Sequence, residues 1–279
     1  MAFDSPLVIC VAPNGARRGK TDHAAIPITP RELAETAGLC LAAGARAMHL
    51  HVRDNAGRHT LDAAHYRAAL HAIRAEVGEQ LLLQITTEAV GLYTPQQQMD
   101  CVYAVQPQAA SVAIRELIPD TPSETSAAQF FRWAASSGIA LQYILYTPEE
   151  VLRLNDLVSR GVIADPQPHA LFVLGRYGAG PRSEPRALLP FLHAWSTDWP
   201  WSLCAFGDTE SRCAAASVAL GGHVRVGFEN NLFRADGQPA ANNSEQVGNI
   251  SALSGYCGRP LASVSQARAV YGTSLPREI

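Results

Sequence analysis

The chain has 279 residues, of which 47% are hydrophobic and 17% are charged, and its formal net charge at pH 7 is −3. This length suits a single α/β barrel with an ample core, and the balanced charge gives no indication of a nucleic-acid partner. No segment approaches the roughly 20 apolar residues of a spanning helix, and no basic region precedes the first apolar run, so we expect a cytoplasmic protein with no membrane partner.

Short apolar segments rich in branched residues recur along the chain, and a turn signal and a helix-like stretch follow each of them. The eight segments are residues 7–12, 47–52, 81–86, 109–114, 141–146, 169–174, 201–206 and 223–228. Spacings of roughly 30 residues accommodate a strand, a crossover helix and two loops, which indicates parallel strands. Eight such units predict an α/β fold, a (β/α)8 TIM barrel, as a single domain over residues 1–279.

Helix start signals lie between these segments. Residues 29–32, Thr-Pro-Arg-Glu, combine an N-cap threonine, a proline at the first helical position and a glutamate three residues after the cap. Residues 147–150 repeat the pattern, and residues 94–95 offer a weaker version. We expect the last helix or two within about 242–279, with a turn at 258–260.

A basic loop, residues 14–21, follows the first predicted strand. It superficially resembles a nucleotide phosphate loop, but the pattern GxxxxGK followed by Ser or Thr requires glycine where Asn14 stands, which excludes a nucleoside triphosphatase of that type. The loop can still bind an anionic substrate at the barrel mouth, and Asn14 and Arg17 are the candidates; a solvated surface loop is the competing interpretation.

Two histidines, His49 and His51, end the second predicted strand. Residues i and i+2 of a strand point to the same face, so both imidazoles can aim at one point in the barrel mouth, as metal ligation requires. Taken alone, the pair is equally compatible with two hydrogen-bonded core histidines. A metal site needs a third ligand.

Polar residues also mark the third and fourth predicted strands. Gln84, Thr86 and Glu88 share one face, where Thr86 can bind a substrate carboxylate and Glu88 can act as an acid or base. Glu88 capping the next helix, or pairing with an arginine, is the favoured alternative on these residues alone. Ser111 is either a polar substrate contact or, as the sequence alone favours, a small residue in a packed layer.

The eighth predicted strand supplies a candidate for the third metal ligand. His223, Arg225, Gly227 and Glu229 share parity and would face the lumen together, with Glu229 at the carboxyl end. A buried arginine and glutamate need partners, which a metal and an anionic substrate would provide; an internal Arg225–Glu229 ion pair is the alternative. Together with the histidine pair, the metal site is the better interpretation, and a ligand set of this type leaves a coordination position open for catalysis.

Several motifs converge on one family. The chain resembles the β-keto acid cleavage enzymes, typified by 3-keto-5-aminohexanoate cleavage enzyme, in order from about residue 7 to residue 270. The similarity rests on the stretch from PITP to HLHVR and on QITTEAVG, LFVLG, GGHVRVGFENN and GRPLASVSQAR.

The resemblance implies a TIM barrel whose zinc, or another divalent metal, is held by His49, His51 and Glu229. It implies an acyltransferase that condenses a β-keto acid with acetyl-CoA as co-substrate and releases acetoacetate and a new acyl-CoA by a retro-Claisen step. The known relatives form homo-oligomers, and the resemblance favours a tetramer.

The resemblance also assigns residue roles. Thr86 and Ser111 match substrate-binding positions, and both keep the hydroxyl group. Arg225 matches an arginine that assists proton abstraction, but its aspartate partner falls on Asn230, whose amide cannot act as a carboxylate base. Glu88 is our candidate substitute for that base.

Specificity is expected to differ from that of the type enzyme. The acidic residues that face a substrate amino group in that enzyme fall on Arg17 and Ile144 here, so we expect a neutral or anionic substrate tail, such as that of a keto-diacid. A metal-dependent aldolase or hydrolase on the same barrel is the alternative function. A non-catalytic barrel that binds a small anion, with His49 and His51 as core residues, is a third.

Overall fold

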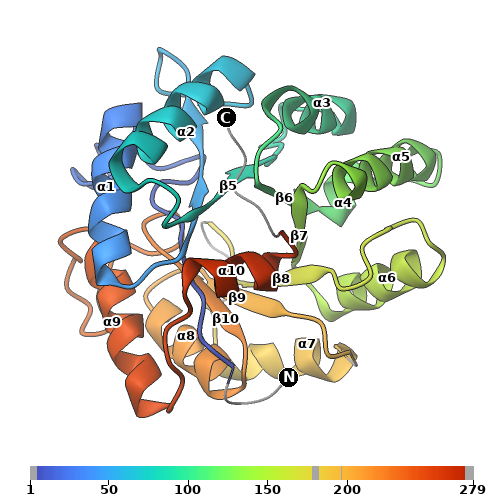
Figure 1. The fold of residues 1–279 in the computed structure, drawn as a ribbon. Helices are drawn as coiled ribbons and strands as arrows, with labels where there is room; N and C mark the ends of the chain where they lie inside the picture. The colour runs from blue at the N-terminus through green and yellow to red at the C-terminus, as the bar shows by residue number, and fades with distance from the viewer. Residues whose placement is uncertain (1–4, 178–181, 196, 274–279) are drawn as a thin grey trace.

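The computed structural model describes residues 5–177, 182–195 and 197–273, which form a closed barrel of eight parallel strands (Figure 1). The strands run around the barrel in the order β1-β10-β9-β8-β7-β6-β5-β2, and β1 closes it by pairing with both β10 and β2. They are β1 (Ile9–Val11), β2 (Ala47–Leu50), β5 (Leu82–Thr86), β6 (Ala109–Ala113), β7 (Ala140–Leu145), β8 (His169–Leu174), β9 (Trp201–Ala205) and β10 (His223–Val226). The predicted (β/α)8 TIM barrel is confirmed, and every predicted strand overlaps an observed one.

Helices surround the barrel in alternation with the strands (Figure 1). They are α1 (Pro30–Ala43), α2 (Ala63–Val77), α3 (Pro95–Val105), α4 (Ile114–Leu117), α5 (Ser123–Ser136), α6 (Pro148–Ser159), η1 (Pro185–Leu188), α7 (Leu189–Ala194), α8 (Glu210–Ala219), α9 (Asn243–Tyr256) and α10 (Val264–Tyr271). A short antiparallel ribbon of β3 (Val52–Arg53) and β4 (His59–Thr60) follows β2. The predicted strand 47–52 is therefore split, because the chain leaves the barrel at His51 and pairs with itself beyond it.

The predicted helix starts coincide with observed caps. Thr29 accepts a hydrogen bond from the backbone of Glu32, and the Glu32 carboxylate accepts one from the backbone of Thr29, which completes a capping box. Thr94 forms the same box with a glutamine three residues later. Thr147 caps α6, but the reciprocal bond of a capping box is absent. The carboxylate of Glu150 instead accepts a hydrogen bond from the backbone amide of Tyr146. Local signals therefore fix where the chain turns from each of these loops into the next helix.

The amino-terminal end of the barrel is closed by an apolar plug. Small and aliphatic side chains from the first positions of the strands pack there against α10, which crosses the opening in Figure 1. The ring of Tyr271 on α10 lies 4.4 Å from that of His169, centroid to centroid, at the start of β8. The predicted C-terminal helical segment comprises α9 and α10, and its residues 274–279 lie outside the described residues. These side chains fill the amino-terminal end of the barrel lumen.

None of the helices within the described ranges combines the length and the apolar character needed to cross a lipid bilayer.

The plug generates a stability prediction. Tyr271 is 2% exposed, so Tyr271→Ala leaves a cavity at the barrel floor and is expected to lower the free energy of unfolding by about 3–5 kcal/mol, as for other buried aromatic residues. Urea denaturation followed by circular dichroism measures the change. Tyr256→Ala is the matched control, because that tyrosine is 91% exposed on α9 and its loss should leave stability within about 0.5 kcal/mol of the parent. Equal effects of the two substitutions would contradict a structural role for the plug.

Candidate metal and substrate site

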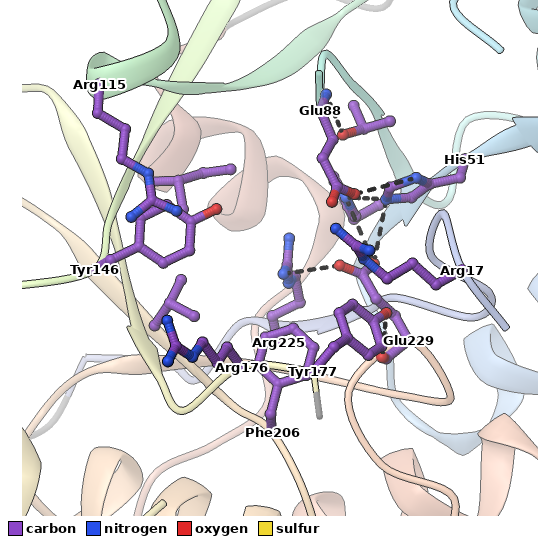
Figure 2. A pocket seen from close by; sticks show the side chains of 14 residues that line it. Arg17, His51, Glu88, Arg115, Tyr146, Arg176, Tyr177, Phe206, Arg225 and Glu229 are labelled. Carbon is purple, nitrogen blue, oxygen red and sulfur yellow. Dashed lines mark hydrogen bonds and ion pairs between the residues drawn. The ribbon is translucent and has the colours of Figure 1, made fainter. Parts of the chain in front are cut away.

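A cavity of about 280 Å³ opens at the carboxyl ends of the strands, where a TIM barrel places its active site (Figure 2). Residues from strand ends and the loops after them line it. They are Arg17, His49, His51, Thr86, Glu88, Arg115, Ile144, Tyr146, Val173, Arg176, Tyr177, Phe206, Arg225 and Glu229. The cavity therefore gathers side chains from all eight barrel strands or the segments that follow them.

Three side-chain atoms converge at one side of this cavity. His49 Nε2 lies 3.2 Å from His51 Nε2 and 3.6 Å from Glu229 Oε2, and His51 Nε2 lies 3.5 Å from the same oxygen. A tetrahedral zinc with bonds of about 2.0–2.1 Å requires its ligand atoms to be about 3.3–3.4 Å apart. The triangle of donors matches that spacing, and the three residues can hold a metal ion.

The carboxylate of Glu229 divides its two oxygens between partners. Oε1 accepts a hydrogen bond from Arg225 Nη2 at 3.1 Å, whereas Oε2 faces the two histidines. Oε2 is buried and accepts no hydrogen bond from any described residue. The Arg225–Glu229 ion pair and the metal-ligand role, which the sequence presented as alternatives, therefore use different oxygens of one side chain.

Electrostatics keep these groups in the forms that metal binding needs. Burial, and then the positive charge of Arg225, lower the pKa of His49 to about 3, so its imidazole is neutral at physiological pH. Burial alone would raise the pKa of Glu229, but Arg225 and the neighbouring histidines hold it below its ordinary value. A neutral imidazole beside an ionised carboxylate is the donor set that a divalent cation prefers.

Contacts from three loops position the backbone that carries Glu229. The Tyr177 hydroxyl donates a hydrogen bond to the Glu229 carbonyl at 2.6 Å. Gly15 lies so close that a Cβ there would stand 2.6 Å from Glu229 Cγ, and its φ of +64° also favours glycine. Buried Arg53 clamps this loop by donating hydrogen bonds to the carbonyls of Gly15 and Arg18.

A buried carboxyl group supports the turn between β10 and Glu229. Glu210, at the start of α8, accepts hydrogen bonds from the Gly227 backbone amide and the Asn231 side chain, both at 3.3 Å. Burial raises the pKa of Glu210 to about 8, so this carboxyl is largely protonated at neutral pH. Sequence reasoning missed both Glu210 and Arg53, because each is a single charged residue in a stretch with no spacing rule that marks it as buried.

The predicted acid or base, Glu88, faces the cavity. Its Oε2 lies 3.9 Å from His51 Nδ1, and its backbone amide donates a hydrogen bond to Thr86 Oγ1 at 3.0 Å. Thr94 caps α3, and Glu88 forms no ion pair with an arginine among the described residues. Neither alternative that the sequence favoured for Glu88 is seen, and its carboxylate is partly exposed to the space a substrate would occupy.

The remaining predicted residues lie at different depths. Arg17 lines the cavity. Ser111 and Asn230 are buried, and their side-chain polar atoms have no hydrogen-bond partner in the described part of the chain. The Asn14 side chain is occupied, since its amide nitrogen donates to the carbonyl of His51 and its oxygen accepts from the His51 backbone amide. Asn14 thus supports the backbone of His51, and its contact with substrate stays a prediction.

A chain of buried side chains crosses the barrel lumen behind His49. His49 Nδ1 lies 2.8 Å from Gln84 Oε1, and Gln84 Nε2 donates to Gln142 Oε1 at 3.2 Å. Gln142 Nε2 lies 3.2 Å from His169 Nε2, which is 2.8 Å from Ser202 Oγ. An amide oxygen can only accept, so Gln84 places the proton of His49 on Nδ1 and directs the lone pair of Nε2 toward the other two donors.

Comparisons with known proteins identify the family to which this chain is similar. A model of the beta-keto acid cleavage enzyme family matches residues 6–273. The chain is 29% identical over 275 residues to a 3-keto-5-aminohexanoate cleavage enzyme of Acetoanaerobium sticklandii, covering 96% of this chain and 98% of that protein. It is also 29% identical over 276 residues to a 3-oxoadipate:acetyl-CoA acetyltransferase of Cupriavidus necator, covering 96% and 95%.

Among solved structures, ObcA in its apo form has a TM-score of 0.70 to this chain at 17% identity. The match covers 90% of this chain and 66% of the ObcA chain, so this chain spans just under two thirds of that protein. At this identity the likeness concerns the fold alone.

The hydrogen bond between His49 and Gln84 predicts how a substitution of Gln84 changes metal affinity. Gln84→Leu removes the acceptor that orients His49 and is expected to weaken zinc binding about 10- to 100-fold, as for other partners of metal-ligating histidines. Gln84→Glu keeps an acceptor of the same length and should restore most of that affinity. Competition with a chromogenic chelator measures the dissociation constants.

Gln108→Leu is the matched control, because Gln108 is equally buried but contacts the backbone of Leu83 and the carboxylate of Glu79 instead of the chain behind His49. Unchanged zinc affinity in Gln84→Leu, or a loss of the same size in Gln108→Leu, would show that the orientation of His49 does not depend on Gln84.

Proposed function

Since the chain belongs to the beta-keto acid cleavage enzyme family, we propose that it condenses a β-keto acid with acetyl-CoA and cleaves the product to acetoacetate and a new acyl-CoA. The observation that carries this proposal is the convergence of His49 Nε2, His51 Nε2 and Glu229 Oε2 on one wall of a cavity that Glu88 also lines. The names of two full-length relatives describe a β-keto acid cleavage and an acetyl-CoA-dependent acyl transfer.

We propose zinc as the metal that His49, His51 and Glu229 hold, although two imidazoles and a carboxylate also suit manganese or iron(II). When bound, such a cation acts as a Lewis acid that polarises the β-keto oxygen and makes the neighbouring carbon acidic. The partly exposed carboxylate of Glu88 lies on the same side of the cavity as this site.

The protein's own side chains then handle protons and charge. Glu88 accepts the proton from the carbon between the carboxylate and the ketone, and Arg225 places a fixed positive charge beside the developing enolate. The hydroxyl groups of Thr86 and Ser111 hold the substrate carboxylate. Buried Asn230, whose amide has no partner among the described residues, serves as a hydrogen-bonding neighbour rather than as the base.

The proposed reaction has two steps, and in each step one bond forms at a carbonyl carbon while another bond breaks. The enolate carbon attacks the acetyl thioester, a carbon–carbon bond forms, and CoA leaves as its thiolate. The thiolate then attacks the original ketone carbon, and the bond between that carbon and the enolate carbon breaks. The tail leaves as acyl-CoA, and Glu88 returns its proton to the released acetoacetate.

The substrate tail is neutral or anionic in this proposal. Arg17 lines the cavity, and Ile144 forms part of its far wall, so neither position offers a carboxylate to an amino group. The Cupriavidus necator relative is named for 3-oxoadipate, a β-keto acid with a second carboxylate. We also propose a cytoplasmic location and a homo-oligomer, with a tetramer favoured by the family resemblance.

The reaction itself is tested with a panel of β-keto acids incubated with the zinc-loaded protein and acetyl-CoA. We expect mass spectrometry to detect acetoacetate and one new acyl-CoA, and both should vanish when acetyl-CoA is withheld. His49→Ala should lose bound metal and product together. Turnover without acetyl-CoA would instead support the metal-dependent aldolase or hydrolase, and metal-free protein from both forms would favour a barrel that only binds an anion.

The role of Glu88 gives a separate prediction. Glu88→Gln preserves the shape of the side chain but removes the base, so turnover should fall about 10²- to 10⁴-fold while bound zinc per chain stays at the parental value. Glu76→Gln, on the exposed face of α2, is the matched control and should leave the rate unchanged. Parental turnover in Glu88→Gln would assign proton abstraction to another group.

A further inference from the structure

The cavity has two chemically different ends. The metal ligands and Glu88 lie on one side, and Arg115, Tyr146 and Arg176 lie on the other, as Figure 2 shows. The near side is built by β1, β2, β5 and β10, and the far side by the strands from β6 to β9. Apolar side chains from this far half complete its wall; they are Ile144, Val173 and Phe206.

Positive charge exceeds negative charge along the wall of this cavity. Four of its lining residues are arginines, whereas its lining carboxylates are Glu88 and Glu229, both at the metal end. Arg225 is neutralised by Glu229. A divalent cation between the histidines would add further positive charge. The far end therefore carries guanidinium groups that no carboxylate of the cavity wall balances.

The two far arginines differ in how they are held. The guanidinium carbon of Arg115 lies 3.5 Å from the centre of the Tyr146 ring, a cation–π contact that fixes its plane at the cavity wall. The carboxylate that pairs with Arg115 is Glu150, on α6, at the long distance of 3.9 Å. Arg176 follows β8, lines the cavity and has no ion-pair partner among the described residues. Both groups keep donors available to a ligand.

We propose that Arg115 and Arg176 form a subsite for a second carboxylate, so that the substrate is a β-keto dicarboxylic acid whose tail carboxylate lies at the far end of the cavity. This inference rests on the proposed function for the orientation of the substrate, whose keto-acid end faces the metal ligands. The apolar wall then contacts the methylene carbons between the two polar ends. Arginine suits this task because its planar donors match a carboxylate.

The phosphates of acetyl-CoA are the other anions that an arginine pair can bind. The geometry favours the carboxylate, because Arg115 and Arg176 line the same small cavity as the metal ligands. The long pantetheine arm separates the phosphates of acetyl-CoA from its thioester, which must react inside that cavity. The two sources are distinguished by whether the variants change the KM for the keto acid or the KM for acetyl-CoA.

The first experiment measures binding without turnover. Calorimetry on the zinc-loaded protein compares unreactive dicarboxylates with monocarboxylates of the same carbon number, such as adipate and hexanoate. We expect adipate to bind about 10- to 100-fold more tightly, the factor that follows from charge-assisted hydrogen bonds to one carboxylate. Arg115→Gln and Arg176→Gln should each reduce that preference and leave hexanoate affinity unchanged. Arg132→Gln, an exposed arginine on α5, is the matched control and should retain the full preference.

The second experiment measures turnover of β-keto diacids and β-keto monoacids with the same variants. We expect kcat/KM for the diacid to fall about 10- to 100-fold in each cavity variant, with the KM for acetyl-CoA at its parental value. Equal binding of adipate and hexanoate by the parent protein, or a rise confined to the KM for acetyl-CoA, would overturn the subsite. If no β-keto acid yields acyl-CoA, the proposed function fails, whereas the calorimetric preference still decides the subsite.

Discussion

The ion pair between Arg225 and Glu229 inside the barrel is the interaction on which the rest of the site depends. A carboxylate and a guanidinium this deeply buried are costly to desolvate, and each is stable there only with compensating partners. Arg225 satisfies one oxygen of Glu229, and the other oxygen faces the imidazoles of His49 and His51. The oxygen of Glu229 that has no hydrogen-bond partner among the described residues makes this part of the lumen suited to a cation. The same carboxylate therefore serves both the stability of the site and its proposed chemistry.

The rest of the lumen follows from that constraint. TIM barrels commonly fill their interior with layers of branched apolar side chains, but the middle of this barrel holds hydrogen-bonded polar groups that run from His49 through Gln84 and Gln142 to His169. The neighbouring groups set the orientation of the side-chain amides of Gln84 and Gln142, because an amide oxygen only accepts hydrogen bonds and an amide nitrogen only donates them. Apolar packing would fill the same volume but could not dictate which nitrogen of His49 carries the proton.

Strand spacing and helix caps made much of the fold predictable from sequence, together with the proximity of His49, His51 and Glu229. His49 and His51 project together because they are two residues apart. Glu229 lies beyond the end of β10, so a turn rather than strand parity brings its carboxylate to the histidines. What escaped prediction lies in loops or depends on distant packing. Arg53 and Glu210 are buried because other segments cover them. Arg115 reaches the cavity from α4, directly after β6, and Arg176 reaches it from the segment after β8. Asn14 lies beside the site, but only the structure shows that its amide is used by the backbone of His51.

The position of β1 between β2 and β10 has a consequence for how the protein is made. The histidines follow from β2, early in the chain, whereas Glu229 comes after β10, the last strand, and the barrel closes only when β10 pairs with β1. During synthesis, His49 and His51 leave the ribosome long before their carboxylate partner exists. Because Glu229 follows the last strand, it can join His49 and His51 only at the final stage of folding, when the barrel closes.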